Sequence, residues 1–138
     1  MLKTLLAAGS LAVLSATLTL PAHAADQRLE CEAEGAGDIS MDARYETRGT
    51  RERFSTEFEA APRGAFKAGQ QMTVIVKQTI VGAVALKKVK GGDIVGDLNL
   101  GRDGNPIPQG FPKVRKDTKV TVQVDGQTVL ACKLKFDD

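Results

Sequence analysis

Apolar and polar side chains alternate along short segments of this chain, and glycine, proline or aspartate residues separate the segments. A period of two is typical of strands, and no stretch keeps the 3.6-residue period of a helix for three turns. Three prolines within residues 105–112 indicate an unpaired crossover loop between two sheets. We predict an all-β fold, an antiparallel β-sandwich that is immunoglobulin-like or jelly-roll-like. Its strands are expected at residues 27–34, 40–48, 51–60, 71–77, 80–89, 93–100, 118–124 and 127–136.

The second and third predicted strands fit together in a single register. A two-residue turn at residues 49–50 places Tyr45 opposite Phe54 and Met41 opposite Phe58, so these apolar side chains share one face. The charged side chains of both strands then take the other face. Because one register sorts both strands, we predict a β-hairpin with this pairing.

The same register sets like charges directly opposite each other at two places. Arg48 faces Arg51 beside the turn, and Asp42 faces Glu57 farther along the strands. Like charges opposed across two strands destabilise a sheet. At these two pairs the hairpin pattern conflicts with cross-strand electrostatics.

The last two predicted strands carry apolar side chains at every second position. A two-residue Asp-Gly turn would put their apolar stripes on opposite faces, whereas a three-residue loop at 125–127 sets Val122 opposite Leu130. We therefore predict the three-residue loop, with Gly126 forming a bulge in the left-handed region.

The predicted strand at 80–89 is apolar on both faces. Such a strand is either buried on both sides or uses its second face to contact a partner. Val81, Ala83 and Ala85 share that second face in a regular strand, so we regard them as the candidate partner-binding face.

The first 24 residues have the features of a secretory signal peptide. Lys3 supplies a positive start, an uncharged apolar run covers residues 5–20, and Pro21 precedes a small-residue cleavage site at 22–24. The run is shorter than the ~20 residues that span a bilayer. We expect one β-sandwich domain at 25–138, no transmembrane segment after cleavage, and a periplasmic or secreted protein.

Two cysteines, Cys31 and Cys132, lie near the two ends of the expected domain. In an oxidising compartment a lone pair of cysteines favours a disulfide. A CxxC-type redox role has no support, because the two residues are far apart in the sequence. We predict a structural Cys31–Cys132 bond that ties both ends of the domain together.

Outside the predicted signal peptide the chain has no histidine, because the single one is His23. This excludes Ser-His-Asp and Cys-His nucleophiles and histidine zinc sites. The formal net charge is only +2, and aromatic residues make up 4% of the chain. Nucleic-acid binding usually requires a basic surface and stacking side chains. We predict no catalytic residue, no metal site, no cofactor and no nucleic-acid partner.

Oxygen-bearing side chains are the remaining candidates for chemistry. Asp93 with Asp97, or Glu57 with Glu59, would form a general acid–base pair if a cleft held them ~5–9 Å apart. The segment 97–105 gathers Asp and Asn side chains of the kind that calcium prefers, but it lacks the spacing of an EF-hand. A solvated strand face and an ordinary Asp-Gly turn are the favoured interpretations.

Basic residues gather at two places in the sequence, and they would favour an anionic partner if folding brought them to one side. A balanced soluble surface is the favoured interpretation. The clusters are Lys87, Lys88 and Lys90, and then Lys113, Arg115, Lys116 and Lys119.

Together these observations predict a non-catalytic binding or interaction module whose partner is an unidentified envelope or extracellular protein. Two alternatives stay open. One is a small β-barrel that carries an apolar ligand or lipid, which requires an internal cavity. The other is a carboxylate-dependent hydrolase, which requires a cleft around paired acidic residues.

Overall fold

All regular elements of the protein are strands in the computed structural model, which describes residues 12, 15, 26–103 and 105–137. The all-β prediction is therefore confirmed for this part of the chain. The expected signal peptide lies almost entirely outside the described residues. Within them, no helix is both long and apolar enough to cross a membrane.

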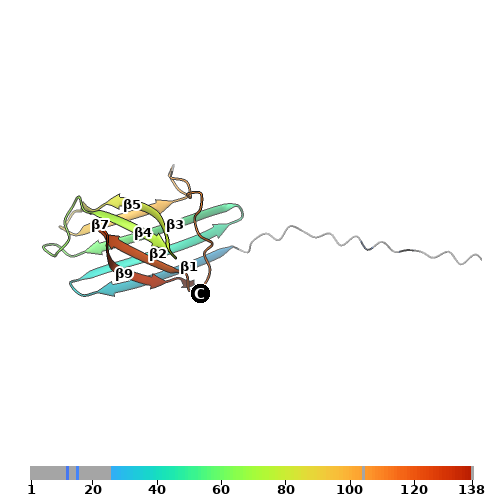
Figure 1. The fold of residues 1–138 in the computed structure, drawn as a ribbon, viewed down its shortest axis with the longest axis horizontal. Coiled ribbons are helices and arrows are strands. Elements are labelled where there is room, and N and C mark those ends of the chain that lie inside the picture. Colours follow the sequence, from blue (N-terminus) through green and yellow to red (C-terminus); the bar gives the residue numbers. More distant parts are fainter. Residues whose placement is uncertain (1–11, 13–14, 16–25, 104, 138) are drawn as a thin grey trace, which may run out of the picture.

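The strands form two antiparallel sheets, which Figure 1 shows packed as two layers. The order is β10-β1-β2-β3-β7-β6 in the six-stranded sheet and β5-β4-β8-β9 in the four-stranded sheet. The bounds are β1 Gln27–Gly35, β2 Ile39–Arg48, β3 Arg51–Ala60, β4 Gln71–Val76, β5 Thr79–Ala85, β6 Lys87–Lys88, β7 Ile94–Leu100, β8 Lys119–Val124, β9 Gln127–Lys133 and β10 Lys135–Phe136.

The core lies between the two sheets. β3 contributes Phe54 and Phe58, which are 1% and 0% exposed, and β4 contributes Met72 at 0%. Alternation explains this placement, because every second side chain of each strand points inward. The outward side chains of the six-stranded sheet are then mostly charged, and they form the surface discussed below.

The predicted hairpin of β2 and β3 is confirmed in full. Tyr45 pairs with Phe54 and Met41 with Phe58, and the turn between the strands has Gly49 at a φ of 57°. Glycine adopts this left-handed backbone without the strain that a side chain would bring.

The last hairpin has the predicted pairing of Val122 with Leu130, but its extra residue lies elsewhere. Asp125 and Gly126 form a tight two-residue turn, with φ values of 48° and 80°. The register then shifts at Val129, which is the extra residue of β9. The prediction of a three-residue loop was wrong, because a bulge inside the strand corrects the register just as well.

Two predicted strands are each divided between the sheets at a buried leucine. The segment 80–89 leaves the four-stranded sheet at Leu86 and continues as β6, and the segment 127–136 does the same at Leu134 and continues as β10. Leu86 is 2% exposed and Leu134 is 0% exposed. Each edge of the sandwich is therefore closed by a chain that passes from one layer to the other.

The predicted disulfide is confirmed: Cys31 on β1 is bonded to Cys132 on β9, with their Cα atoms 5.8 Å apart. Since β1 and β9 belong to different sheets, the bond fastens the two layers to each other. It lies on the same side of the sandwich as the β9–β10 crossing.

The segment after β7 connects the six-stranded sheet to β8 in the four-stranded sheet, so the predicted crossover loop is confirmed. Phe111 in this loop packs on Tyr45 and Phe54, with ring centroids 6.3 and 5.4 Å away. These three rings fill the end of the core that lies beneath the arginine-rich surface described next.

Candidate docking surface on the six-stranded sheet

Five arginines gather at one end of the outer face of the six-stranded sheet. β2 supplies two, β3 supplies two, and one follows β7. They line two neighbouring hollows that share Glu46 and one of the arginines. We call this set the arginine zone: Arg44, Arg48, Arg51, Arg53 and Arg102.

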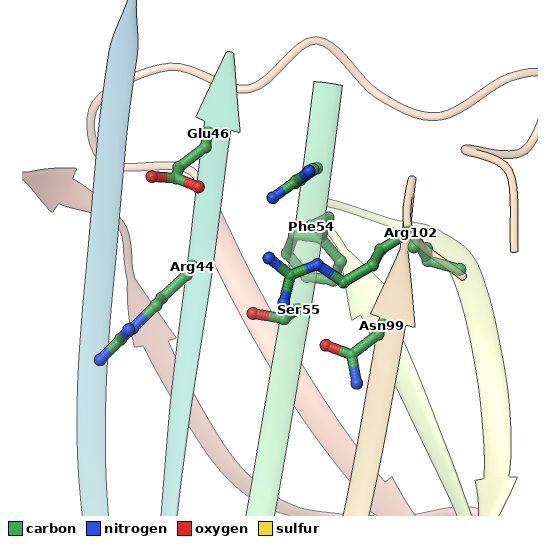
Figure 2. Close-up of a pocket in the computed structure, with 8 residues that line it drawn as sticks. Arg44, Glu46, Phe54, Ser55, Asn99 and Arg102 are labelled. Atoms are coloured by element: carbon green, nitrogen blue, oxygen red, sulfur yellow. The ribbon is translucent and has the colours of Figure 1, made fainter. Parts of the chain in front are cut away.

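Figure 2 shows one of the two hollows in close-up. This hollow measures about 150 Å³, and Ser55 and Asn99 add a hydroxyl and an amide to its lining. Arg102 extends from the end of β7 back toward β3, whereas Arg44 is directed toward β1. The second hollow, of about 170 Å³, is lined by Arg48, Arg51, Arg53 and Glu46. Guanidinium groups in such forks bind carboxylates and other oxyanions.

Most of these guanidinium groups have no acidic partner. The Nε atom of Arg44 lies 3.7 Å from Oε2 of Glu30 and 3.9 Å from Oδ2 of Asp42. In residues 26–103 and 105–137, no salt bridge includes Arg48, Arg51, Arg53 or Arg102. Four positive charges are thus available to a ligand or partner.

A row of four acidic residues crosses the same face farther along the strands. Glu32 pairs with Asp42, Asp42 with Glu57, and Glu57 with Asp97, on β1, β2, β3 and β7 respectively. We call these four residues the carboxylate row. The neighbouring row on this face consists of Glu30, Arg44, Ser55 and Asn99. Arg44, Ser55 and Asn99 of this neighbouring row line the hollow of Figure 2.

The pKa values of the two central carboxyls reflect this crowding. Partial burial raises the pKa of Asp42, Glu32 and Asp97 raise it further, and Arg44 opposes the rise. Burial also raises the pKa of Glu57, and the charges of Asp42 and Asp97 add to the effect. Both carboxylates are therefore ionised at a cost to the folded state.

We predict that Glu57→Gln stabilises the protein at neutral pH. The change removes repulsion from Asp42 on one side and Asp97 on the other, each worth roughly 0.2–1 kcal/mol. The free energy of unfolding should rise by about 0.5–1 kcal/mol at pH 7. Urea denaturation of the variant and the wild type measures this difference.

The advantage of Glu57→Gln should depend on pH in a defined direction. Because the pKa of Glu57 is raised in the folded protein, the Glu57 carboxyl does not destabilise the fold while it is protonated. The free energy of unfolding of the wild type then falls as the pH rises through the raised pKa. The gain should thus vanish near pH ~3. Glu30→Gln is the control, because Glu30 faces Lys135 and Arg44 and its loss should not stabilise. A gain that is equal at both pH values would contradict the electrostatic explanation.

The candidate partner-binding face on the segment 80–89 is not formed as predicted. Ile80 pairs with Ile75 and Gly82 with Val74, so Val81 is an extra residue in β5. Val81 turns into the core and is 5% exposed, while Ala83 and Ala85 are exposed. Because of this bulge, Ile80 takes the place of Val81 on the outer face of the four-stranded sheet, where Ile80 is 66% exposed.

The acidic pairs considered for catalysis are rearranged by the fold. Asp97 lies opposite Glu57, and a side-chain hydrogen bond with Asp93 raises the pKa of Glu59, because the protonated Glu59 carboxyl donates it. Both pairs belong to the open outer face of the sheet. Across the described ranges, no group of three or more His, Cys, Asp or Glu side chains is arranged to hold a metal ion.

The strand residues of the two basic clusters lie on different sheets. Lys87 and Lys88 form β6 at the edge of the six-stranded sheet, whereas Lys119 begins β8 in the four-stranded sheet. The arginine zone was missed as a cluster because its members come from separate segments. The like-charge pair Arg48–Arg51 was the sequence signal that pointed to it.

Comparison with protein-family models, with curated proteins and with solved structures finds no match for this chain.

Proposed function

We propose that the protein is a non-catalytic binding module, exported to the periplasm or the extracellular space, that docks a protein partner on the outer face of its six-stranded sheet. The observation that carries this proposal is the arginine zone. Arg48, Arg51, Arg53 and Arg102 have no ion pair among the described residues, and Arg48 and Arg51 face each other at a cost to stability. Unpaired charges of this kind steer and orient an oppositely charged partner.

The mixture of charges on the face favours a protein partner over a polymeric anion. A nucleic acid or anionic polysaccharide would cover the arginine zone and then meet the carboxylate row, which repels it. A protein surface can place acidic groups over the arginine zone and basic groups over the carboxylate row. Protein recognition is thus the function that this surface fits best.

The location is supported by the disulfide, because such bonds persist in oxidising compartments. The predicted signal peptide at residues 1–24 agrees with export. The carrier alternative has less support, since the strands form two sheets with the apolar side chains packed between them. The hydrolase alternative would need a cleft that holds both members of an acidic pair, whereas the hollow beside Asp97 is lined by no second carboxyl among the described residues.

Affinity capture with matched charge variants tests the proposal. We expect the oxidised domain 25–138 to retain a protein partner from the native envelope fraction, and the variant Arg53→Glu/Arg102→Glu to lose at least about 90% of it, as expected for the loss of central charged contacts. Mass spectrometry identifies and quantifies the captured proteins.

The control variant is Lys77→Glu/Lys119→Glu, which changes the net charge by the same amount. Lys77 and Lys119 are exposed: Lys77 lies in the turn between β4 and β5, Lys119 begins β8, and the Lys77 backbone N–H donates to the Lys119 carbonyl. This control should retain the partner. Equal capture by the arginine variant and the wild type would exclude the arginine zone as the docking surface.

A further inference from the structure

We infer that a hollow at one end of the sandwich binds a single-chain amphiphile with an anionic headgroup, that is, a carboxylate or a phosphate on a hydrocarbon chain. The site goes beyond the proposed function, because it follows the last residue of β3, whereas the arginine zone lies near the first. The hollow measures about 950 Å³, within the roughly 300–1,000 Å³ of ligand sites. We call it the end hollow, and its lining includes Pro62, Arg63, Phe66, Lys67, Lys88 and Ile94.

The apolar part of the end hollow continues the core of the sandwich. The Phe66 ring packs edge-on against the Phe58 ring, with centroids 5.1 Å apart, and Phe58 is fully buried. Ile94, which begins β7, is also buried and lines the hollow. A hydrocarbon chain in this place would contact side chains that already pack on the core, and its removal from water is favourable.

Three cations line the same hollow, and no carboxyl group does so among the described residues. They are Arg63, Lys67 and Lys88. None of them takes part in a salt bridge within residues 26–103 and 105–137. The sequence accounts for this bias, because residues 60–92 contain no aspartate or glutamate. An anionic headgroup would supply the missing negative charge, and Arg and Lys side chains bind carboxylates and phosphates alike.

The register of β6 directs one of its two lysines to the side of the hollow. Lys88 pairs with Ile94, whose side chain is buried, whereas Lys87 pairs with Val95, the next residue of β7. Residues directly opposite each other share a face of the sheet, and successive residues take opposite faces. Lys88 is therefore on the inner face, beside the apolar side chains of the hollow, and Lys87 is on the outer face.

Backbone hydrogen bonds hold the two loops that form the end hollow. In the β3–β4 connection, the Gly69 N–H donates to the Leu86 carbonyl at 2.8 Å. In the turn after β6, the Gly92 N–H donates to the Val89 carbonyl at 3.0 Å. The loops meet at Gly92, where an added Cβ atom would lie 3.2 Å from the Cβ atom of Pro62. A hollow that is formed before the ligand arrives loses little affinity to ordering.

Arg63 has a backbone conformation that favours glycine. Its φ is 64°, in the left-handed region that residues other than Gly, Asn and Asp seldom adopt. An arginine at a strained position is expected where its side chain is used, as at ligand sites. Replacement by glycine would relieve this strain and remove the charge in one step.

The recessed apolar side chains favour one ligand molecule over a membrane surface. Ile94 is 6% exposed and Phe66 is partly buried, so both lie below the exposed lysines and arginine of the lining. A protein that lies on a bilayer inserts protruding apolar groups among the headgroups. A single chain can instead enter the hollow and leave its headgroup at the cationic rim.

NMR titration of oxidised 25–138 with decanoate, below its micelle concentration, tests both binding and place. We expect amide shifts within residues 63–68 and 88–94. Each buried CH₂ group is worth about fourfold in affinity, so octanoate should bind about fourfold to fifteenfold more weakly. Decyl maltoside has the same chain as decanoate and no charge, and it should bind at least about tenfold more weakly. Decyl phosphate is the second anionic probe, and the tighter of the two assigns the headgroup.

Matched charge variants test the role of the cations. Arg63→Gly/Lys88→Gln should weaken decanoate binding at least about tenfold. Lys77→Gln/Lys87→Gln removes the same charge from the same acid-free stretch but leaves the lining intact, so its binding should stay within about twofold of wild type. Circular dichroism verifies folding, and Lys88→Gln alone replaces the first variant if that variant does not fold.

Four results would overturn the inference: no binding of either anionic probe, amide shifts confined to other parts of the chain, equal binding of decyl maltoside, or equal losses in the two double variants. Binding to phosphatidylglycerol vesicles without binding to either monomeric probe would also overturn it, in favour of a membrane surface. The proposed function is tested separately by capture with Arg53→Glu/Arg102→Glu, so each of the two can fail without the other.

Discussion

Replacing the disulfide by Cys31→Ala/Cys132→Ala should lower the free energy of unfolding by about 3–4 kcal/mol. The bond joins residues separated by 101 positions, and it links β1 in one sheet to β9 in the other. Closing a loop of about 100 residues restricts the unfolded chain by up to ~4.7 kcal/mol, and measured effects are usually smaller. The loss is a large part of the roughly 5–15 kcal/mol that stabilises a domain of this kind.

Thermal and urea denaturation of the double variant measure this effect. A loss of this size corresponds to roughly 12–16 °C in Tm, at about 4 °C per kcal/mol for a domain of this length. Wild-type protein treated with a reductant is the control, and it should show the same loss, because the bond and not the side-chain volume is responsible. A variant that unfolds within about 1 kcal/mol of wild type would show that the sheets hold together without the bond.

Gly101→Ala should destabilise the protein by about 2–4 kcal/mol. Gly101 follows β7 at a φ of 80°, where a residue with a side chain pays roughly 1–2 kcal/mol. A Cβ atom at this position would also overlap the backbone oxygen of Glu52, so the β3–β7 end would have to move apart. The end of β7 carries Arg102, and the same substitution should displace that side chain from the arginine zone.

The chain offers a matched control for this prediction at Gly126. Its φ is also 80°, but no atom lies within 4 Å of an added Cβ. Gly126→Ala should therefore cost only about 1 kcal/mol, the conformational part of the effect. Urea denaturation of both variants separates backbone strain from steric overlap. Equal losses in the two variants would show that the overlap at Glu52 is relieved without cost.

The stability and binding predictions meet at Glu57. Glu57→Gln should stabilise the monomer, because Glu57 lies between two other carboxylates. The same residue belongs to the face that we propose as the docking surface for a protein partner. A face that accepts repulsion in the free protein and loses it on docking is the usual compromise between stability and function. If the carboxylate row has no role in docking, Glu57→Gln should be more stable and should capture the same partner as the wild type.

The charged face of the six-stranded sheet shows which residue pairs a local sequence pattern can predict. The hairpin register already opposed Arg48 to Arg51 and Asp42 to Glu57, since both depend only on a short turn and a period of two. The extension of the row to Asp97 and the addition of Arg102 depend on the pairing of β3 with β7. That pairing joins segments about forty residues apart, and no short-range periodicity specifies it.

Local patterns were enough to predict the all-β architecture, the β2–β3 register and the partner of each cysteine. Alternation and turn length act over short distances, and two cysteines leave one pairing. The places where a strand changes sheet, and the direction of a bulged residue, depend on packing between the two layers. The apolar alternation continues through Leu86 and Leu134, yet a strand of the four-stranded sheet ends just before each of them. Each leucine is buried in the core between the layers, where the chain passes from one sheet to the other. Val81 is buried and Ile80 exposed because a single extra residue in β5 reverses the alternation, and only packing against the opposite sheet selects where that residue is inserted.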